Sequence, residues 1–147
     1  MANNYMQTSF VVDCGSKEAR DDVLAYALAI CEPDENTHPD IDQEKAIEQR
    51  DEFCGGDISV DGETALWFCG EESFDMQYFD AVIEYAMKKY KLQPVMYTWA
   101  YTCSKMREDE FGGGACVFVY DPTTDTVKSD SIGSFQWARQ RIEELTQ

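Results

Sequence analysis

The sequence predicts an α+β fold, in which an antiparallel or mixed β-sheet carries helices packed on one face as a two-layer sandwich. Segments with the alternating pattern of strands are joined by short turns, which favours antiparallel neighbours, and other segments show the spacing of amphipathic helices. The chain of 147 residues, 44% of them hydrophobic, suits one domain over residues 1–147. A strongly acidic stretch at about 32–57 reads as an insertion into that domain.

The chain opens with a predicted strand at residues 5–12, followed by a helix over residues 16–31. Ser16 is a suitable N-cap, because its side chain can accept a hydrogen bond from the first turn. Val23, Ala27 and Ile30 then recur at helical spacing. The helix is expected to end before the first proline, at position 33.

Residues 58–69 are predicted to form a hairpin. Asp61 and Gly62 are the pair that a two-residue type I′ turn prefers, since both central residues of that turn need positive φ. The second strand, 65–69, is apolar on both sides. We therefore expect it to lie centrally in the sheet and to be buried on both faces.

The second half of the chain repeats the two kinds of pattern. Apolar residues at helical spacing, a cap from Ser73 or Asp75 and three terminal lysines predict a helix over 74–91. Alternation predicts strands at 95–103 and 115–120, then a short edge strand at 126–130. A final amphipathic helix is lined by Phe135, Ala138, Ile142 and Leu145.

The acidic insertion contains a short helical pattern at residues 41–53. Asp40 with Gln43 resembles a capping box for this helix, which has few apolar positions and is expected to lie on the surface. His38, the only histidine, is expected to be a solvated loop residue. The acids of 34–44 alternate as in a calcium loop, but Pro39 stands where an EF-hand needs glycine, so we predict no metal site.

The net charge of −17 is unevenly distributed along the chain. Residues 32–63 hold twelve acids and two bases, so more than half of the net charge lies in under a quarter of the sequence. Such a field repels nucleic acid and membrane surfaces and attracts basic partners. No apolar run is long enough to span a membrane and no signal peptide is evident, so a cytoplasmic protein with reduced cysteines is expected.

The segment at 98–120 offers a candidate for nucleophilic catalysis, whereas the paired carboxylates Glu71 and Glu72 are interpreted as solvated loop charges. Cys103 is a possible nucleophile, with Lys105 and Arg107 beside it, but no histidine is available nearby to activate the thiol. The three glycines at 112–114 precede a strand and not a helix, which favours a structural role over a phosphate site. We predict no catalytic residue and no cofactor, and Lys105 and Arg107 are the first candidates for contact with an anion.

The combination of W-A-Y-T-C-S-K at 99–105 with E-F-G-G-G at 110–114, after A-L-W-F-C-G-E-E at 65–72, resembles a family of small acidic proteins of bacteriophages and bacteria. The resemblance covers roughly the central 40% of the chain. It implies a phage or mobile-element origin and supplies no catalytic residues. Small acidic phage proteins often inhibit host defence, as anti-CRISPR or anti-restriction proteins do.

These observations favour a non-enzymatic inhibitor that imitates DNA and occupies the basic nucleic-acid-binding surface of a host nuclease complex. Direct binding to nucleic acid or membranes is not expected. One alternative is a homodimeric binding module, joined through an exposed strand or the aromatic face at 97–101. The other is an enzyme that uses Cys103, Lys105 and Arg107. The predicted partner-binding residues are Asp40, Asp42, Glu44, Glu48, Asp51, Glu52, Asp57 and Asp61.

Overall fold

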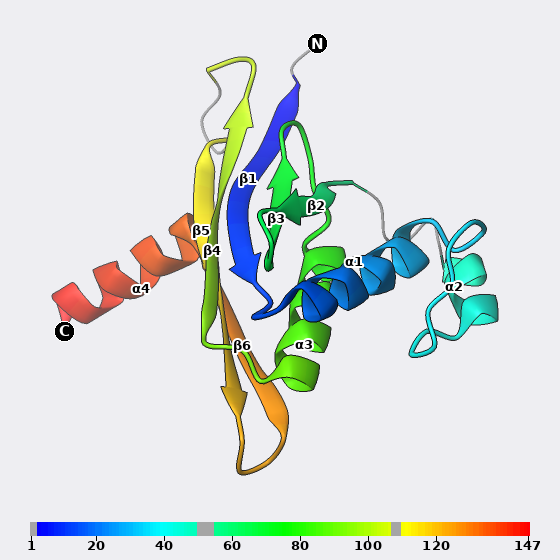
Figure 1. Cartoon of the computed structure of the whole chain (residues 1–147). Coiled ribbons are helices and arrows are strands. Elements are labelled where there is room, and N and C mark those ends of the chain that lie inside the picture. The colour runs from blue at the N-terminus through cyan, green and yellow to red at the C-terminus, as the bar shows by residue number, and fades with distance from the viewer. Residues whose placement is uncertain (1–2, 50–54, 107–109) are drawn as a thin grey trace.

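The computed structural model describes residues 3–49, 55–106 and 110–147, and it confirms the α+β class. Within these residues a six-stranded antiparallel sheet is combined with four helices (Figure 1). The elements are β1 (Asn4–Asp13), α1 (Lys17–Cys31), α2 (Gln43–Gln49), β2 (Asp57–Asp61), β3 (Ala65–Gly70), α3 (Met76–Tyr90), β4 (Val95–Cys103), β5 (Gly112–Asp121), β6 (Thr126–Gly133) and α4 (Ser134–Thr146).

The strands follow the order β2-β3-β1-β4-β5-β6, and every neighbouring pair is antiparallel. The two central strands, β1 and β4, are hydrogen-bonded over only part of their length. β1 pairs with β4 only from Asn4 to Thr8, and beyond that point β1 pairs with β3 while β4 pairs with β5. The sheet is therefore divided at one end into two three-stranded halves.

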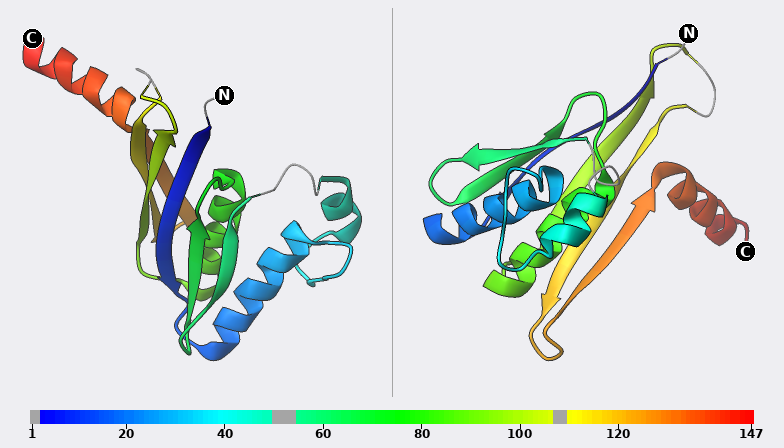
Figure 2. Two further views of the ribbon diagram at one scale, coloured as in Figure 1. Left: turned by 90° about the horizontal axis from the view of Figure 1, so that it is seen from above. Right: turned by 90° about the vertical axis from the view of Figure 1, so that its right-hand side faces the viewer.

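The core lies between one face of the sheet and the helices α1 and α3, which both lie on that side (Figure 2). The Phe10 ring stacks between Phe68 and Tyr97, with centroid distances of 4.8 and 4.5 Å, and Phe79 of α3 meets the Phe10 ring edge-on. Tyr97 is fully buried, so the aromatic side of 97–101 is not a free interface at that position. Trp99 and Tyr101, the other aromatic residues of that side, are half-buried.

The helix signals in the sequence are confirmed where side chains cap the backbone. Ser16 accepts a hydrogen bond from the Ala19 amide at 3.1 Å, and Asp75 accepts one from the Gln77 amide at 2.9 Å. In the insertion the prediction was wrong, because it is the Asp42 carboxylate that accepts from the Lys45 amide at 3.3 Å. Asp42 therefore caps α2 in place of Asp40.

Two predictions for the hairpin of β2 and β3 were wrong. Asp61 pairs with Ala65, so three residues form the loop, and of its residues Gly62 alone adopts positive φ, at 72°. The side chains of β3 alternate between buried Leu66 and Phe68 on one face and half-exposed Trp67 on the other. Although β3 is apolar on both sides, helices cover only one of its faces. Within the described residues no helix packs on the opposite side of the sheet.

Helix α4 follows the edge strand β6 and runs outward from the sheet (Figure 2). None of its residues is buried. Its first turn is fixed to the sheet by Ser134, whose Oγ accepts from the Gly113 amide at 3.1 Å. The predicted amphipathic helix is thus present, but most of its apolar side is uncovered.

Candidate functional site

The most strongly charged part of the described chain lies on the side opposite α4, on α2 and the edge strand β2 (Figure 1). We call the exposed carboxylates there the acidic end. Helix α1 packs against both β2 and α2 and so connects them. Within the described part of 32–63, Lys45 is the only base. The acidic end consists of Asp42, Glu44, Glu48, Asp57 and Asp61.

Of the other predicted partner-binding residues, Asp51 and Glu52 lie outside the described residues, as does Arg107. Asp40 is described, but its charge is engaged within the molecule. Its Oδ2 accepts a hydrogen bond from the Tyr85 hydroxyl at 2.8 Å and lies 3.4 Å from the Lys89 Nζ. These contacts, the Tyr85 hydrogen bond first, lower the pKa of Asp40.

Asp40 belongs to a polar cluster that fixes the insertion to α1 and α3. We call it the anchor network, and its centre is Asp22 of α1. The His38 Nδ1 accepts from the Asp40 amide at 3.0 Å, so the proton lies on Nε2, which donates to Asp22 Oδ1 at 2.6 Å. The second oxygen, Asp22 Oδ2, accepts hydrogen bonds from the hydroxyls of Tyr85, at 3.0 Å, and Tyr90. It also forms an ion pair with Lys89 Nζ at 2.9 Å.

The electrostatics of the anchor network follow from these contacts. Partial burial of Asp22 raises its pKa, but hydrogen bonds from Tyr90, His38, Lys89 and Tyr85 outweigh burial and hold the pKa well below its usual range. The pKa of Tyr90 rises to about 12, because of burial and then because it donates to Asp22. Asp22 is therefore an anion, and the tyrosines remain protonated donors at neutral pH.

His38 is buried, with 6% of its surface exposed, so the prediction of a solvated loop residue was wrong. Its ring is also enclosed by Tyr26 and Tyr85, both edge-on, with centroids 5.5 and 5.6 Å away. The sequence holds no signal for this network, because the partners come from three segments up to 68 residues apart. Only Tyr85 and Lys89 stand at helical spacing.

The catalytic candidates of the sequence do not form a nucleophile–base pair in the contacts of the described residues. Cys103 is buried at the end of β4, and its thiol donates to Glu110 Oε2 at 2.9 Å. Both ring nitrogens of His38 are engaged with Asp22 and Asp40. Lys105 is exposed beside Ser104, whose Oγ accepts from the Asn3 amide at 2.7 Å.

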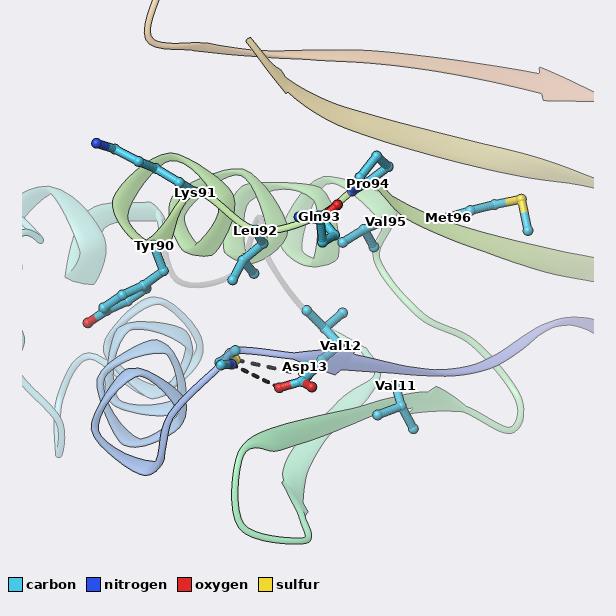
Figure 3. Close-up of a pocket in the computed structure, with 12 residues that line it drawn as sticks. Val11, Val12, Asp13, Tyr90, Lys91, Leu92, Gln93, Pro94, Val95 and Met96 are labelled. Carbon is cyan, nitrogen blue, oxygen red and sulfur yellow. Dashed lines mark hydrogen bonds between the residues drawn. The ribbon is translucent and has the colours of Figure 1, made fainter. Parts of the chain in front are cut away.

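A cavity of about 520 Å³ lies where β1 and β4 separate (Figure 3). Val12, Leu92 and Val95 point into the gap, which is closed by the connection between α3 and β4. Cys14, at its margin, is buried, and burial raises the pKa of its thiol to about 11. A thiol with such a pKa is not a nucleophile at neutral pH, so this cavity offers no catalytic chemistry through Cys14.

The three glycines after the loop have a packing role. Gly114 lies beneath the Trp99 indole, and a Cβ atom added there would lie 2.6 Å from Trp99 Cζ2 and would also meet the Ile132 carbonyl oxygen. Ser134 and Phe135 of α4 likewise lie close to Gly112, in the space that a Cβ atom there would occupy. Glycine at these positions permits the close approach of the aromatic ring and of α4.

The described residues hold no group of three or more His, Cys, Asp or Glu side chains placed to bind a metal. No helix among them has the length and apolar character needed to cross a membrane. Comparisons with protein-family models, with curated proteins and with solved structures find no match to the chain. The resemblance to small acidic phage proteins therefore rests on the sequence motifs alone.

Proposed function

We propose that the protein is a non-enzymatic inhibitor whose acidic end occupies the basic nucleic-acid-binding surface of a host defence nuclease. The observation that carries the proposal is the number of exposed carboxylates on α2 and on the edge strand β2, two elements that both pack against α1. A basic groove evolved to bind phosphates attracts such a surface through the same long-range field.

The spacing of the carboxylates suits this purpose. Glu44 and Glu48 are one helical turn apart on α2, which places their Cβ atoms about 5–6 Å from each other. Asp57 and Asp61 lie on one side of the edge strand, about 13 Å apart at roughly 3.3 Å per residue. Within each pair, charges at these distances can contact neighbouring basic side chains, as successive phosphates do. Asp57 and Asp61 point to the face of the sheet opposite α1, so the two pairs form two sides of the acidic end.

The anchor network supports the proposal because it limits the entropy lost on binding. His38 and Asp40 attach the segment before α2 to α1 and α3 through hydrogen bonds of 2.6 and 2.8 Å. The Gln43 side chain also donates to the Pro33 carbonyl at 3.2 Å. A charged surface that is already ordered in the free protein binds more tightly than a flexible one with the same charges.

The test is displacement of labelled duplex DNA from purified CRISPR and restriction effector complexes in a band-shift assay. The test variant reverses three charges of the acidic end: Glu44→Lys, Glu48→Lys and Asp57→Lys. The control reverses three exposed charges elsewhere, Glu71→Lys, Glu72→Lys and Glu84→Lys, and so has the same net charge.

We expect the wild type to release DNA from at least one effector and the control variant to retain this ability. The acidic-end variant should need about 10-fold more protein or above, as expected when several interfacial charges are reversed. Equal displacement by the two variants would show that net charge, and not the acidic end, is responsible. Failure of the wild type with all effectors would reject the proposal.

A further inference from the structure

The face of the sheet opposite α1 and α3 carries a group of exposed apolar side chains on four strands. Each alternates with a core residue, and they form cross-strand pairs of Val11 with Trp67 and of Met96 with Val117. Their exposed fractions lie between 40 and 64%. We call these residues the open face. It consists of two groups on either side of the cavity between β1 and β4: Val11 with Trp67, and Met96 with Val117 and Val119.

The side chains of the open face offer solvent no free hydrogen-bonding group. The one polar atom of these side chains, the Trp67 indole nitrogen, donates to Ser9 Oγ of the neighbouring strand at 2.9 Å. What the Trp67 ring presents to solvent is therefore hydrocarbon. Exposed patches of this kind in soluble proteins mark sites of interaction with other macromolecules.

Helix α4 carries a second uncovered apolar surface. Its large apolar side chains are between 53 and 68% exposed, and none of its residues is buried. Three of them lie on one side of the helix, and we call this group the α4 stripe: Phe135, Ile142 and Leu145.

The two surfaces cannot cover each other within one chain while α4 keeps its contacts with the sheet. Gly112 pairs with Tyr101, and both lie on the same face of the sheet as the buried Tyr97. A Cβ atom added to Gly112 would meet Ser134 and Phe135, so α4 starts on this face, which also bears α1 and α3. Ser134 Oγ holds this start through the Gly113 amide. From there α4 runs outward, away from the strands (Figure 2).

We propose that the occupant of the open face is the α4 stripe of a second copy of this chain, in a reciprocal homodimer. At roughly 150–250 Å² for each large side chain, with the aliphatic ones near the lower limit, the exposed fractions correspond to about 450 Å² for the open face and about 300 Å² for the α4 stripe. A reciprocal contact therefore covers on the order of 750 Å² of apolar surface per copy. A standard-size interface buries roughly 800 Å² per partner, so the two surfaces together are large enough for a specific dimer.

The charges around the two surfaces agree with this pairing. Asp57 and Asp61 pair with Cys69 and Ala65 and so lie at the β2 margin of the open face. Helix α4 carries two arginines and two glutamates, so it has no net charge despite the strongly acidic chain. Its contact with a second copy brings together no like-charged surfaces, whereas contact between two acidic ends would.

The test measures the oligomeric state of the full chain at micromolar concentration by sedimentation and light scattering. One variant changes the stripe (Ile142→Asp with Leu145→Asp). Another changes the open face (Met96→Glu with Val117→Lys), which places opposite charges directly across the sheet. The control is Val60→Lys on β2, because Val60 is 48% exposed but pairs with Leu66 and so belongs to neither surface.

We expect the wild type and the control to be dimers, and each double variant to raise the dissociation constant about 30-fold or more, as for loss of central apolar anchors. An equimolar mixture of the two double variants should associate more strongly than either alone, because one of the two reciprocal contacts remains intact. A monomeric wild type overturns the proposal. So does a dimer that the open-face variant leaves unchanged, since α4 would then pair elsewhere.

Discussion

Replacing Asp22 by alanine tests the anchor network, because this carboxylate is the acceptor for four donors. The change leaves the His38 ring N–H, in a position that is only 6% exposed, with only the long contact of 3.4 Å to the Tyr85 hydroxyl. It also removes the acceptor of Tyr90 and one acceptor of Tyr85, while Lys89 keeps Asp40 and solvent. The insertion would then be attached to α1 and α3 by fewer hydrogen bonds.

The size of the effect follows from the burial of these donors. A buried donor left with only a long contact costs up to the roughly 1–3 kcal/mol of an unpaired one, and the partly exposed tyrosines add a fraction of that, which gives a total of about 2–4 kcal/mol. For a chain of this length, 1 kcal/mol corresponds to roughly 2–4 °C, so the melting temperature should fall by about 5–15 °C. The matched control is Asp21→Ala, which removes an exposed carboxylate paired with Arg20 and should cost roughly 0.5 kcal/mol or less.

The assay is urea unfolding, followed by tryptophan fluorescence at several pH values. The pKa of Asp22 is lowered in the folded state, so its contribution is fully present above the unfolded pKa of about 4 and is lost as the pH falls through the folded value. The stability difference between wild type and Asp22→Ala should be constant near neutral pH and decrease below about pH 4. Equal stabilities of Asp22→Ala and Asp21→Ala, or a difference that persists in acid, would refute this reasoning.

Two further predictions concern packing. Gly114→Ala should destabilise the protein by about 1–3 kcal/mol in thermal unfolding, because its Cβ would meet Trp99, whereas Gly133→Ala, whose Cβ would meet nothing closer than 3.8 Å, should be nearly neutral. A thiol reagent at pH 8 should modify Cys14 of the folded protein far more slowly than after denaturation, since Cys14 is buried and its pKa is about 11. Rapid labelling of native Cys14 would contradict the packing at the start of α1.

Most of the elements could be predicted from local patterns, because their determinants lie within a few residues. The Ser16 and Asp75 caps and the alternation of β4 are examples. The burial of β3 on one face could not be predicted, because apolar side chains on both sides read as a doubly covered strand. Whether a second layer exists depends on where α4 goes, and that is decided by its contacts with Gly112 and Gly113.

The acidic end was predictable in part, because charge density is a property of sequence. Glu44, Glu48 and Asp57 were expected on the surface and lie there. The internal use of Asp40 was not predictable, since its partners Tyr85 and Lys89 stand 45 and 49 residues away. His38 was misjudged for the same reason, because only tertiary structure brings the Asp22 carboxylate to a histidine in a polar loop.

The most direct test of the central claim is the salt dependence of DNA displacement, comparing the wild type with the triple variant Glu44→Lys, Glu48→Lys and Asp57→Lys. We predict that the wild type displaces DNA from a defence effector at about 50 mM salt with roughly 10-fold or greater advantage over the variant. The ratio between the two potencies should decrease at about 200 mM salt, because screening weakens the contacts between charges. Equal potency of the two proteins at low salt would contradict the claim that the acidic end binds a basic nucleic-acid site.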